Sequence, residues 1–175
     1  MANAISVPDP ITFEQAIALT ESLMAQMPTL SEPALESSLS ALLASENGAR
    51  GFFVTYLTDE GSLPDQPSPA VIRALQSSPA VVAELLVKNL AMSSAMAIAH
   101  RRNQNEEMAQ GSDRVQRRTL DLIQKVQLPE VSARAARLQE SASTGSGDYA
   151  AFLNRWGYDD QQRQVIVQQM QQVVS

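Results

Sequence analysis

The chain of 175 residues contains no cysteine, which excludes disulfide bonds, thiol catalysis and zinc or iron–sulfur sites built on thiolates. It has a single histidine, so a Ser-His-Asp arrangement would have to be built on His100. The N-terminus lacks the basic start and long apolar run of a secretory signal, and we therefore expect a cytoplasmic protein.

Charged residues are also scarce, at 18% of the chain against the roughly 25% that is typical of globular domains. The net charge of −6 disfavours non-specific binding to nucleic acid or to anionic membranes. The charge is distributed unevenly, because residues 1–65 contain nine acidic residues and one basic residue, a net charge of −8. A lightly charged surface is compatible with self-association, and equally with a surface rich in Gln and Ser.

One apolar segment, Pro79–Arg102, is long enough to organise the fold. Ser78 can cap its N-terminus, and Pro79 suits the first helical position. Its large aliphatic residues spread around most of the helical wheel, which indicates a helix buried in the centre of a bundle. Glu84 and Lys88 argue against a membrane span, since each charge near the bilayer centre costs roughly 2.5–3.5 kcal/mol.

The remaining apolar periodicity predicts an all-α fold, a compact bundle of about seven or eight helices around Pro79–Arg102. Thr12 and Gln15 form a capping-box pattern at the start of the first helix. The second helix is expected to end at Asn47-Gly48, a common C-terminal signal. Residues 52–57 have a strand-like composition, but no partner strand is in sight, so we expect a short helix there.

Residues 1–10 are expected to form an irregular leader, and residues 11–175 a single helical domain. The polar residues after Arg102 favour helix and could continue the central helix as far as Gly111. An amphipathic helix is predicted over residues 113–127. Residues 141–147 are rich in Gly and Ser and predict a flexible loop. The C-terminal segment, residues 140–175, could contain this loop and a docked helical hairpin whose first helix is capped by Asp148.

His100 is the first candidate for a ligand site, as an anchor for a metal, haem or another pigment in the bundle interior. Met92 and Met96 precede it by two turns and one turn on a related face. A metal site needs more than one good ligand, and no Glu-x-x-His pair accompanies His100. Methionines at helical spacing usually fill gaps in a core. We therefore expect neither a metal nor a cofactor.

A basic region forms the second candidate, and it could meet phosphates or an acidic protein surface. Its residues are Arg101, Arg102, Arg114, Arg117, Arg118, Arg134 and Arg137. Asp113 and Asp121 flank Arg117 in an i,i+4 ladder of alternating sign, which favours a surface network over a phosphate site. Docking onto an acidic patch, such as the N-terminal third of another copy, is the stronger alternative.

Aromatic residues gather near the C-terminus, where Tyr149, Phe152 and Trp156 share one predicted helical face. Such residues are enriched in binding hot spots, and they are also what a small hairpin needs for packing. We expect core packing for this face, with Arg155 and Tyr158 as the candidates to face outward.

These patterns contain no nucleophile elbow and no phosphate-binding or dinucleotide fingerprint, and we expect no enzymatic activity. The leading hypothesis is a protein-interaction, scaffolding or regulatory module that associates with itself or with a protein partner. The first alternative is a bundle that binds an apolar or tetrapyrrole ligand near His100. The second is weak nucleic-acid binding through residues 101–118.

Overall fold

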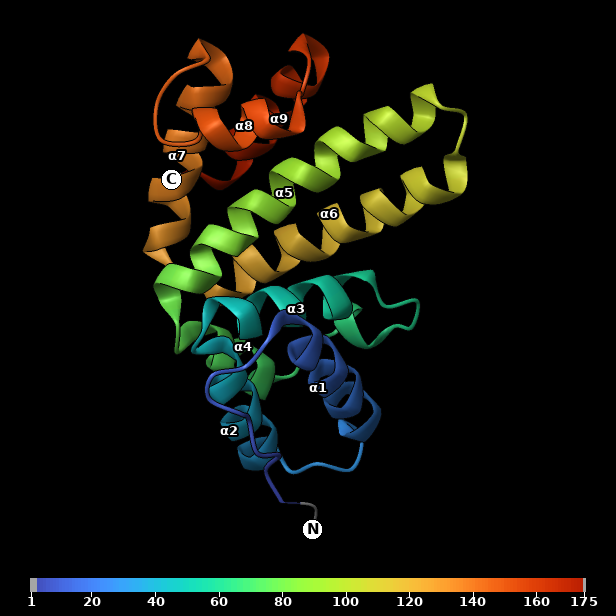
Figure 1. Cartoon of the computed structure of the whole chain (residues 1–175), viewed down its shortest axis with the longest axis vertical. Helices are drawn as coiled ribbons and strands as arrows, with labels where there is room; N and C mark the ends of the chain where they lie inside the picture. The colour runs from blue at the N-terminus through green and yellow to red at the C-terminus, as the bar shows by residue number, and fades with distance from the viewer. Residues whose placement is uncertain (1–2, 175) are drawn as a thin grey trace. The chain divides into compact units, whose positions relative to one another are not determined.

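The computed structural model describes residues 3–174, and the fold of these residues is all-α, as the sequence predicts. It contains nine α-helices, more than the seven or eight expected, one short 3-10 helix and no strand (Figure 1). The helices are α1 (Phe13–Gln26), α2 (Glu32–Leu43), α3 (Glu46–Thr58), η1 (Leu63–Asp65), α4 (Pro69–Gln76), α5 (Pro79–Arg102), α6 (Glu106–Val126), α7 (Pro129–Thr144), α8 (Ala150–Trp156) and α9 (Asp160–Val173).

The chain divides into two compact units, Met1–Leu85 (unit 1) and Leu86–Ser175 (unit 2). The boundary falls within α5, so the first residues of this helix belong to unit 1 and the rest to unit 2. This division does not decide whether the units fold together, and the single domain therefore stays a prediction.

In unit 1, α1 pairs with α3 and α2 pairs with α4. Gly51 allows α1 and α3 to approach closely, because a Cβ at this position would lie 2.4 Å from the Cβ of Ala16. On the same helix, the rings of Phe52 and Tyr56 stack at 4.9 Å, and both are almost completely buried. Residues 52–57, whose composition is strand-like, are thus helical as expected, and they lie in the buried core of unit 1.

The expected helix end at Asn47-Gly48 is wrong, because both residues lie in the first turn of α3. Ser45 is the actual cap, and its hydroxyl accepts a hydrogen bond from the amide of Gly48 at 3.1 Å. A Cβ on Gly48 would lie 1.9 Å from the carbonyl oxygen of Leu42. This glycine therefore provides space between two consecutive helices and does not provide a positive φ.

The leader is irregular over the residues that the structure describes, 3–10, as expected. It is held against unit 1 by the amide of Ile5, which donates to the hydroxyl of Ser38 at 2.7 Å. Immediately after it, the side chain of Asn47 donates to the carbonyl of Ile11 at 3.2 Å. The irregular segment is therefore tied to α2 and α3.

In unit 2, α5 and α6 are the two long helices and run side by side in opposite directions (Figure 1). The helix α5 spans Pro79–Arg102, as predicted, and the alternative that it continues to Gly111 is wrong, because the chain turns through Gln104 at φ 57°. Asn105 then caps α6 by accepting a hydrogen bond from the amide of Met108 at 3.1 Å. Gly111 lies inside α6, which begins seven residues before the predicted position.

The C-terminal helices of unit 2 pack together, with α8 and α9 both against α7. The expected loop at residues 141–147 is partly wrong, since α7 continues to Thr144 and Gly145 ends it with φ 77°. The hydroxyl of Ser141 accepts a hydrogen bond from the amide of Tyr149 at 3.1 Å, which ties the two ends of this connection. Asp148 does not cap α8, because that helix begins at Ala150.

The buried residues of α5 are small or aliphatic, and they include Val82, Leu86, Leu90 and Ala95. Within residues 3–174, α5 is the one helix whose length and apolar composition would suffice to cross a membrane. More than half of its apolar window, 56%, is buried by the rest of the chain. A core helix of a bundle has the same property. The absence of a membrane span stays a prediction.

Candidate functional site

A groove on unit 1, which we call the α1/α3 groove, has a mixed apolar and acidic lining. It has a volume of about 610 Å³. Its lining residues are Ile17, Glu21, Met24, Ala25, Val54, Thr55, Thr58, Asp59 and Leu63.

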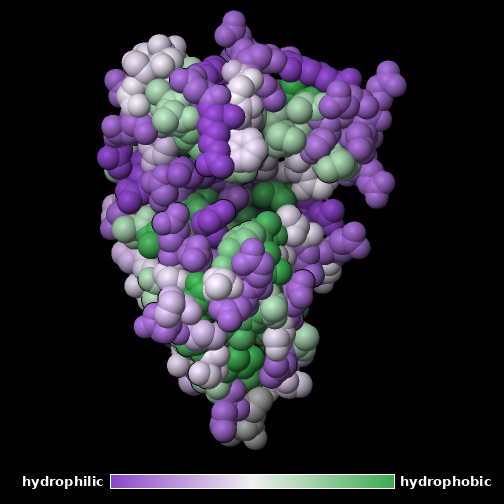
Figure 2. Space-filling view, viewed as in Figure 1, coloured by the Kyte–Doolittle hydropathy of each residue, from purple (hydrophilic) through white to green (hydrophobic). Residues whose placement is uncertain are grey.

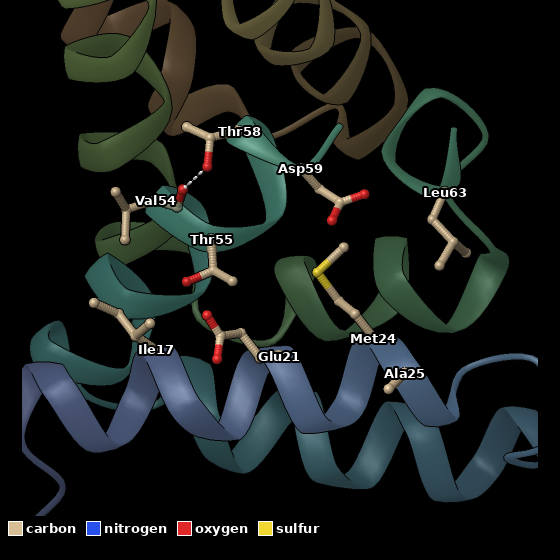
Figure 3. Close-up of a pocket in the computed structure, with 9 residues that line it drawn as sticks. All are labelled: Ile17, Glu21, Met24, Ala25, Val54, Thr55, Thr58, Asp59 and Leu63. Carbon is tan, nitrogen blue, oxygen red and sulfur yellow. Dashed lines mark hydrogen bonds between the residues drawn. The ribbon is translucent and has the colours of Figure 1, made fainter. Parts of the chain in front are cut away.

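Three elements position these side chains (Figure 3). The helix α1 forms one side of the groove, the last turns of α3 form the other, and Leu63 of η1 lies at one end. The sulfur of Met24 points into the space between α1 and α3. The carboxylates of Glu21 and Asp59 enter the groove from opposite helices, so the lining combines an apolar base with negative charge.

Helix ends increase the negative potential of the groove. The C-terminus of α3 carries a partial negative charge, and neither α1 nor α3 has a basic residue in its last turn to offset it. Asp59 follows α3 directly and accepts a hydrogen bond from the amide of Gly61 at 2.9 Å. Glu21 is exposed and has no ion-pair partner within residues 3–174. The groove therefore favours a positively charged ligand.

Two large apolar side chains at the groove remain accessible to solvent. Val54 is 44% exposed and Leu63 is 40% exposed. Figure 2 shows that hydrophobic surface gathers over the helices of unit 1, whereas unit 2 is mainly hydrophilic on the side that this view presents. Convergent exposed apolar residues mark interaction sites more often than single ones do.

A second groove, of about 630 Å³, lies on unit 2 between α6 and the end of α9. Its carboxylates are already paired, since Asp113 lies 2.6 Å from the guanidinium of Arg101 and Asp121 lies 2.8 Å from the ammonium of Lys125. None of the four large apolar residues that are exposed within residues 3–174 lines it. This second groove therefore offers less to a binding partner than the α1/α3 groove does.

The end of α8 and the glycine that follows it, which we call the Trp156 corner (residues 155–157), present a large aromatic side chain to solvent. Trp156 is 49% exposed, and the guanidinium carbon of Arg155 lies 5.8 Å from the centre of its ring. Gly157 ends α8 with φ 64°, a conformation that favours glycine. Arg163 fixes the turn by donating hydrogen bonds to the side chain of Asn154 at 2.9 Å and the carbonyl of Tyr158 at 3.0 Å.

The prediction that Tyr158 faces outward is wrong, because this residue is only 6% exposed. Its hydroxyl has no hydrogen-bond partner among the described residues. Burial raises the pKa of Tyr158 to about 12. Arg155 is exposed as predicted, while Trp156, expected in the core, takes the outward position.

The structure engages two of the predicted basic candidates in local ion pairs. Arg101 bonds to Asp113 and Glu106, and these hydrogen bonds raise the pKa of its guanidinium. Arg102 bonds to Asp159 at the start of α9, which raises the pKa of Arg102 and lowers that of Asp159. These pairs fasten α5 to α6 and to α9, and each phosphate contact at Arg101 or Arg102 would have to displace a carboxylate.

The other basic candidates differ in exposure, since Arg117 and Arg137 are exposed and Arg134 is half-buried. Arg118 is buried, with 2% of its surface exposed, and Arg114 is half-buried. Nucleic-acid binding through residues 101–118 therefore stays a prediction.

His100, Met92 and Met96 follow one another by single turns along α5, and all three are half-buried. In the part of the chain that the structure describes, no three His, Asp or Glu side chains form a group that could hold a metal ion.

Sequence reasoning missed the α1/α3 groove, although it identified the acidic N-terminal third. Ile17 and Met24 lie on the predicted apolar face of α1, and Val54 lies in the predicted short helix. The missing information was the pairing of α1 with α3. The close approach of Gly51 to Ala16, which sets this pairing, has no sequence signal beyond a glycine within a helix.

The sequence model of one protein family, described as Uncharacterised conserved protein UCP020893, matches residues 12–173 of the chain. This range begins at the cap of α1 and ends at the last residue of α9. No curated protein and no solved structure matches the chain.

Proposed function

The chain belongs to this family, and from that premise we propose that it is a helical protein-interaction module, used for scaffolding or regulation, whose docking surface is the α1/α3 groove. The observation that carries the proposal is the convergence of exposed apolar residues and carboxylates in one groove. Binding rather than catalysis is proposed because apolar area supplies affinity, while charges at its edge select the partner.

The groove has the form that helical ligands use. Ile17, Glu21 and Met24 lie on one face of α1 at spacings of four and three residues. An amphipathic segment placed along this face could contact Met24 and Val54 with its apolar side and Glu21 with a basic residue. The small area of the α1/α3 groove favours a weak, reversible contact with such a segment.

A photo-reactive aromatic amino acid in place of Leu63 tests the proposal in the native host. The expected result is one cross-linked protein segment that contains a large apolar residue next to Lys or Arg. The cross-link should disappear when Val54→Glu adds a charge to the groove. The same photo-reactive group at Ala41, an exposed position on α2, is the matched control. Equal cross-linking from both positions, or none from Leu63, would refute the groove as the docking surface.

A further inference from the structure

We infer that the α1/α3 groove binds the Trp156 corner of a second copy of this chain. The inference rests on the proposed function and names the segment that the groove takes. The contact would place the indole of Trp156 between Met24 and Val54, and the guanidinium of Arg155 beside Glu21.

The groove requires a large apolar side chain with an adjacent positive charge. Met24, Val54 and Leu63 supply apolar surface, whereas Glu21, Asp59 and the C-terminus of α3 supply negative charge. No Lys or Arg is among the residues that line it. A purely apolar segment would leave the carboxylate of Glu21 uncompensated as water leaves, which is costly.

The Trp156 corner supplies that combination. Four large apolar residues are exposed within residues 3–174, and two of them, Val54 and Leu63, belong to the groove itself. Met108 follows Glu106 and Glu107, whose charges would be repelled by the groove. Trp156 is the remaining one, and the guanidinium carbon of Arg155 lies 5.8 Å from the centre of its ring.

The charges of the two surfaces are complementary and available. Arg155 has no ion pair within the described residues, and neither does Glu21. Unit 1 contains ten acidic and two basic residues, while unit 2 contains nine acidic and eleven basic residues. The long-range field therefore also favours contact between unit 1 of one copy and unit 2 of another.

The Trp156 corner is held in its shape before binding, which reduces the entropy cost of association. Arg163 donates hydrogen bonds to Asn154 and Tyr158, which lie on either side of Gly157. Tyr158, the residue after Gly157, is itself buried. A tryptophan that is presented in this way is the residue type most enriched in binding hot spots.

The groove and the corner are different surfaces, so each copy would use one to bind its neighbour on one side and the other to bind its neighbour on the other side. Such a head-to-tail contact builds rings or open chains and not a two-fold dimer. The protein would then be a self-assembling scaffold.

Mixing two full-length variants tests the contact by sedimentation velocity. Val54→Glu disables the groove, and Trp156→Ala disables the corner. Each variant alone should associate roughly thirty-fold more weakly than the wild type, as expected for loss of a hot spot. An equimolar mixture should form a one-to-one pair and stop there, because it contains one intact groove and one intact corner. Met108→Ala is the matched control and should assemble like the wild type.

Charge exchange gives an independent readout. Glu21→Arg or Arg155→Glu alone should weaken assembly, and the double variant should recover it. Circular dichroism and a cooperative melt must show that each variant is folded. A wild type that stays monomeric, or a mixture that gives no pair, would overturn the inference. If the photo-reactive group at Leu63 captures a segment of another protein while the wild type stays monomeric, the docking function stands and self-binding is refuted.

Discussion

Gly51 and Gly111 both lie inside helices, but only Gly51 faces another helix at close range. A Cβ at Gly51 would lie 2.4 Å from the Cβ of Ala16, whereas one at Gly111 would find its nearest neighbour, the side chain of Arg114, at 3.9 Å. The sequence shows the same residue type in both places. The roles of the two glycines differ because Gly51 lies against α1, which is remote in the chain, whereas Gly111 has no other helix within 4 Å.

The change from Gly to Ala should therefore have opposite effects on stability at these two positions. Gly51→Ala is expected to destabilise the protein by about 1–3 kcal/mol, because α1 and α3 must move apart. Gly111→Ala is expected to stabilise it by about 0.5–1 kcal/mol through helix propensity. Chemical denaturation of both variants measures this. A Gly51→Ala variant as stable as the wild type would contradict the close packing of α1 and α3.

Tyr158 gives the second prediction at this scale. Its phenol ionises at about pH 12 in the folded protein and near pH 10 when unfolded, so the unfolded state loses its proton first. The stability contributed by the neutral ring is complete below pH 10 and is lost as the pH rises toward 12.

Tyr158→Phe should remove this alkaline loss. At neutral pH the variant should be at least as stable as the wild type, because the replaced hydroxyl has no hydrogen-bond partner among residues 3–174. Thermal melts from pH 7 to alkaline pH, with an ultraviolet titration of the tyrosines, measure both effects. A large loss of stability at neutral pH would show that the hydroxyl does have a partner.

The sequence predicted some helix boundaries correctly and others wrongly. Thr12 caps α1 as predicted, since a side-chain acceptor acts within a single turn. The helices α6 and α8 begin at Glu106 and Ala150 and not at the predicted positions. The end at Asn47-Gly48 was wrong, because Gly48 has no positive φ and lies in the first turn of α3. Gly145 and Gly157 have positive φ and do end their helices.

Asp159 joins two elements and gives a prediction at this scale. It caps α9 by accepting a hydrogen bond from the amide of Gln162 at 3.0 Å, and it pairs with Arg102 of α5. The bond to Arg102 lowers the pKa of Asp159, so its stabilising contribution is present above its ordinary pKa and is lost as the pH falls through the lower folded value.

Asp159→Asn keeps the capping acceptor and removes the charge. The variant should melt below the wild type at neutral pH, and the difference should shrink as the pH falls below about 4. Asp160→Asn, one residue later in the same exposed turn, is the control and should change the melting temperature little. A difference that is independent of pH would exclude the ion pair as its source.

Across the whole molecule, the fold class and the central role of Pro79–Arg102 followed from periodicity and composition, because burial of a helix is recorded in its own residues. The groove could not be predicted in this way, since it exists only where α1, α3 and η1 meet. The aromatic face of α8 shows the same limit. Its spacing is helical, but Trp156 is the last residue of a seven-residue helix and is exposed, whereas Leu153 is buried.

The uneven charge along the sequence affects binding through the surface that the folded chain forms. The sequence places most of its excess negative charge in residues 1–65, and the structure directs two of these carboxylates, Glu21 and Asp59, into the α1/α3 groove. Added salt should therefore weaken assembly, because the charges involved lie at an exposed rim.

The fluorescence of Trp156, the single tryptophan of the chain, tests this docking most directly. Its side chain is 49% exposed in the isolated chain, and docking into the groove of another copy would remove it from water. We predict that the emission of the wild type shifts to shorter wavelength as the concentration rises, and that salt or the Val54→Glu change moves this shift to higher concentration. An emission maximum that is the same at every concentration would contradict the account.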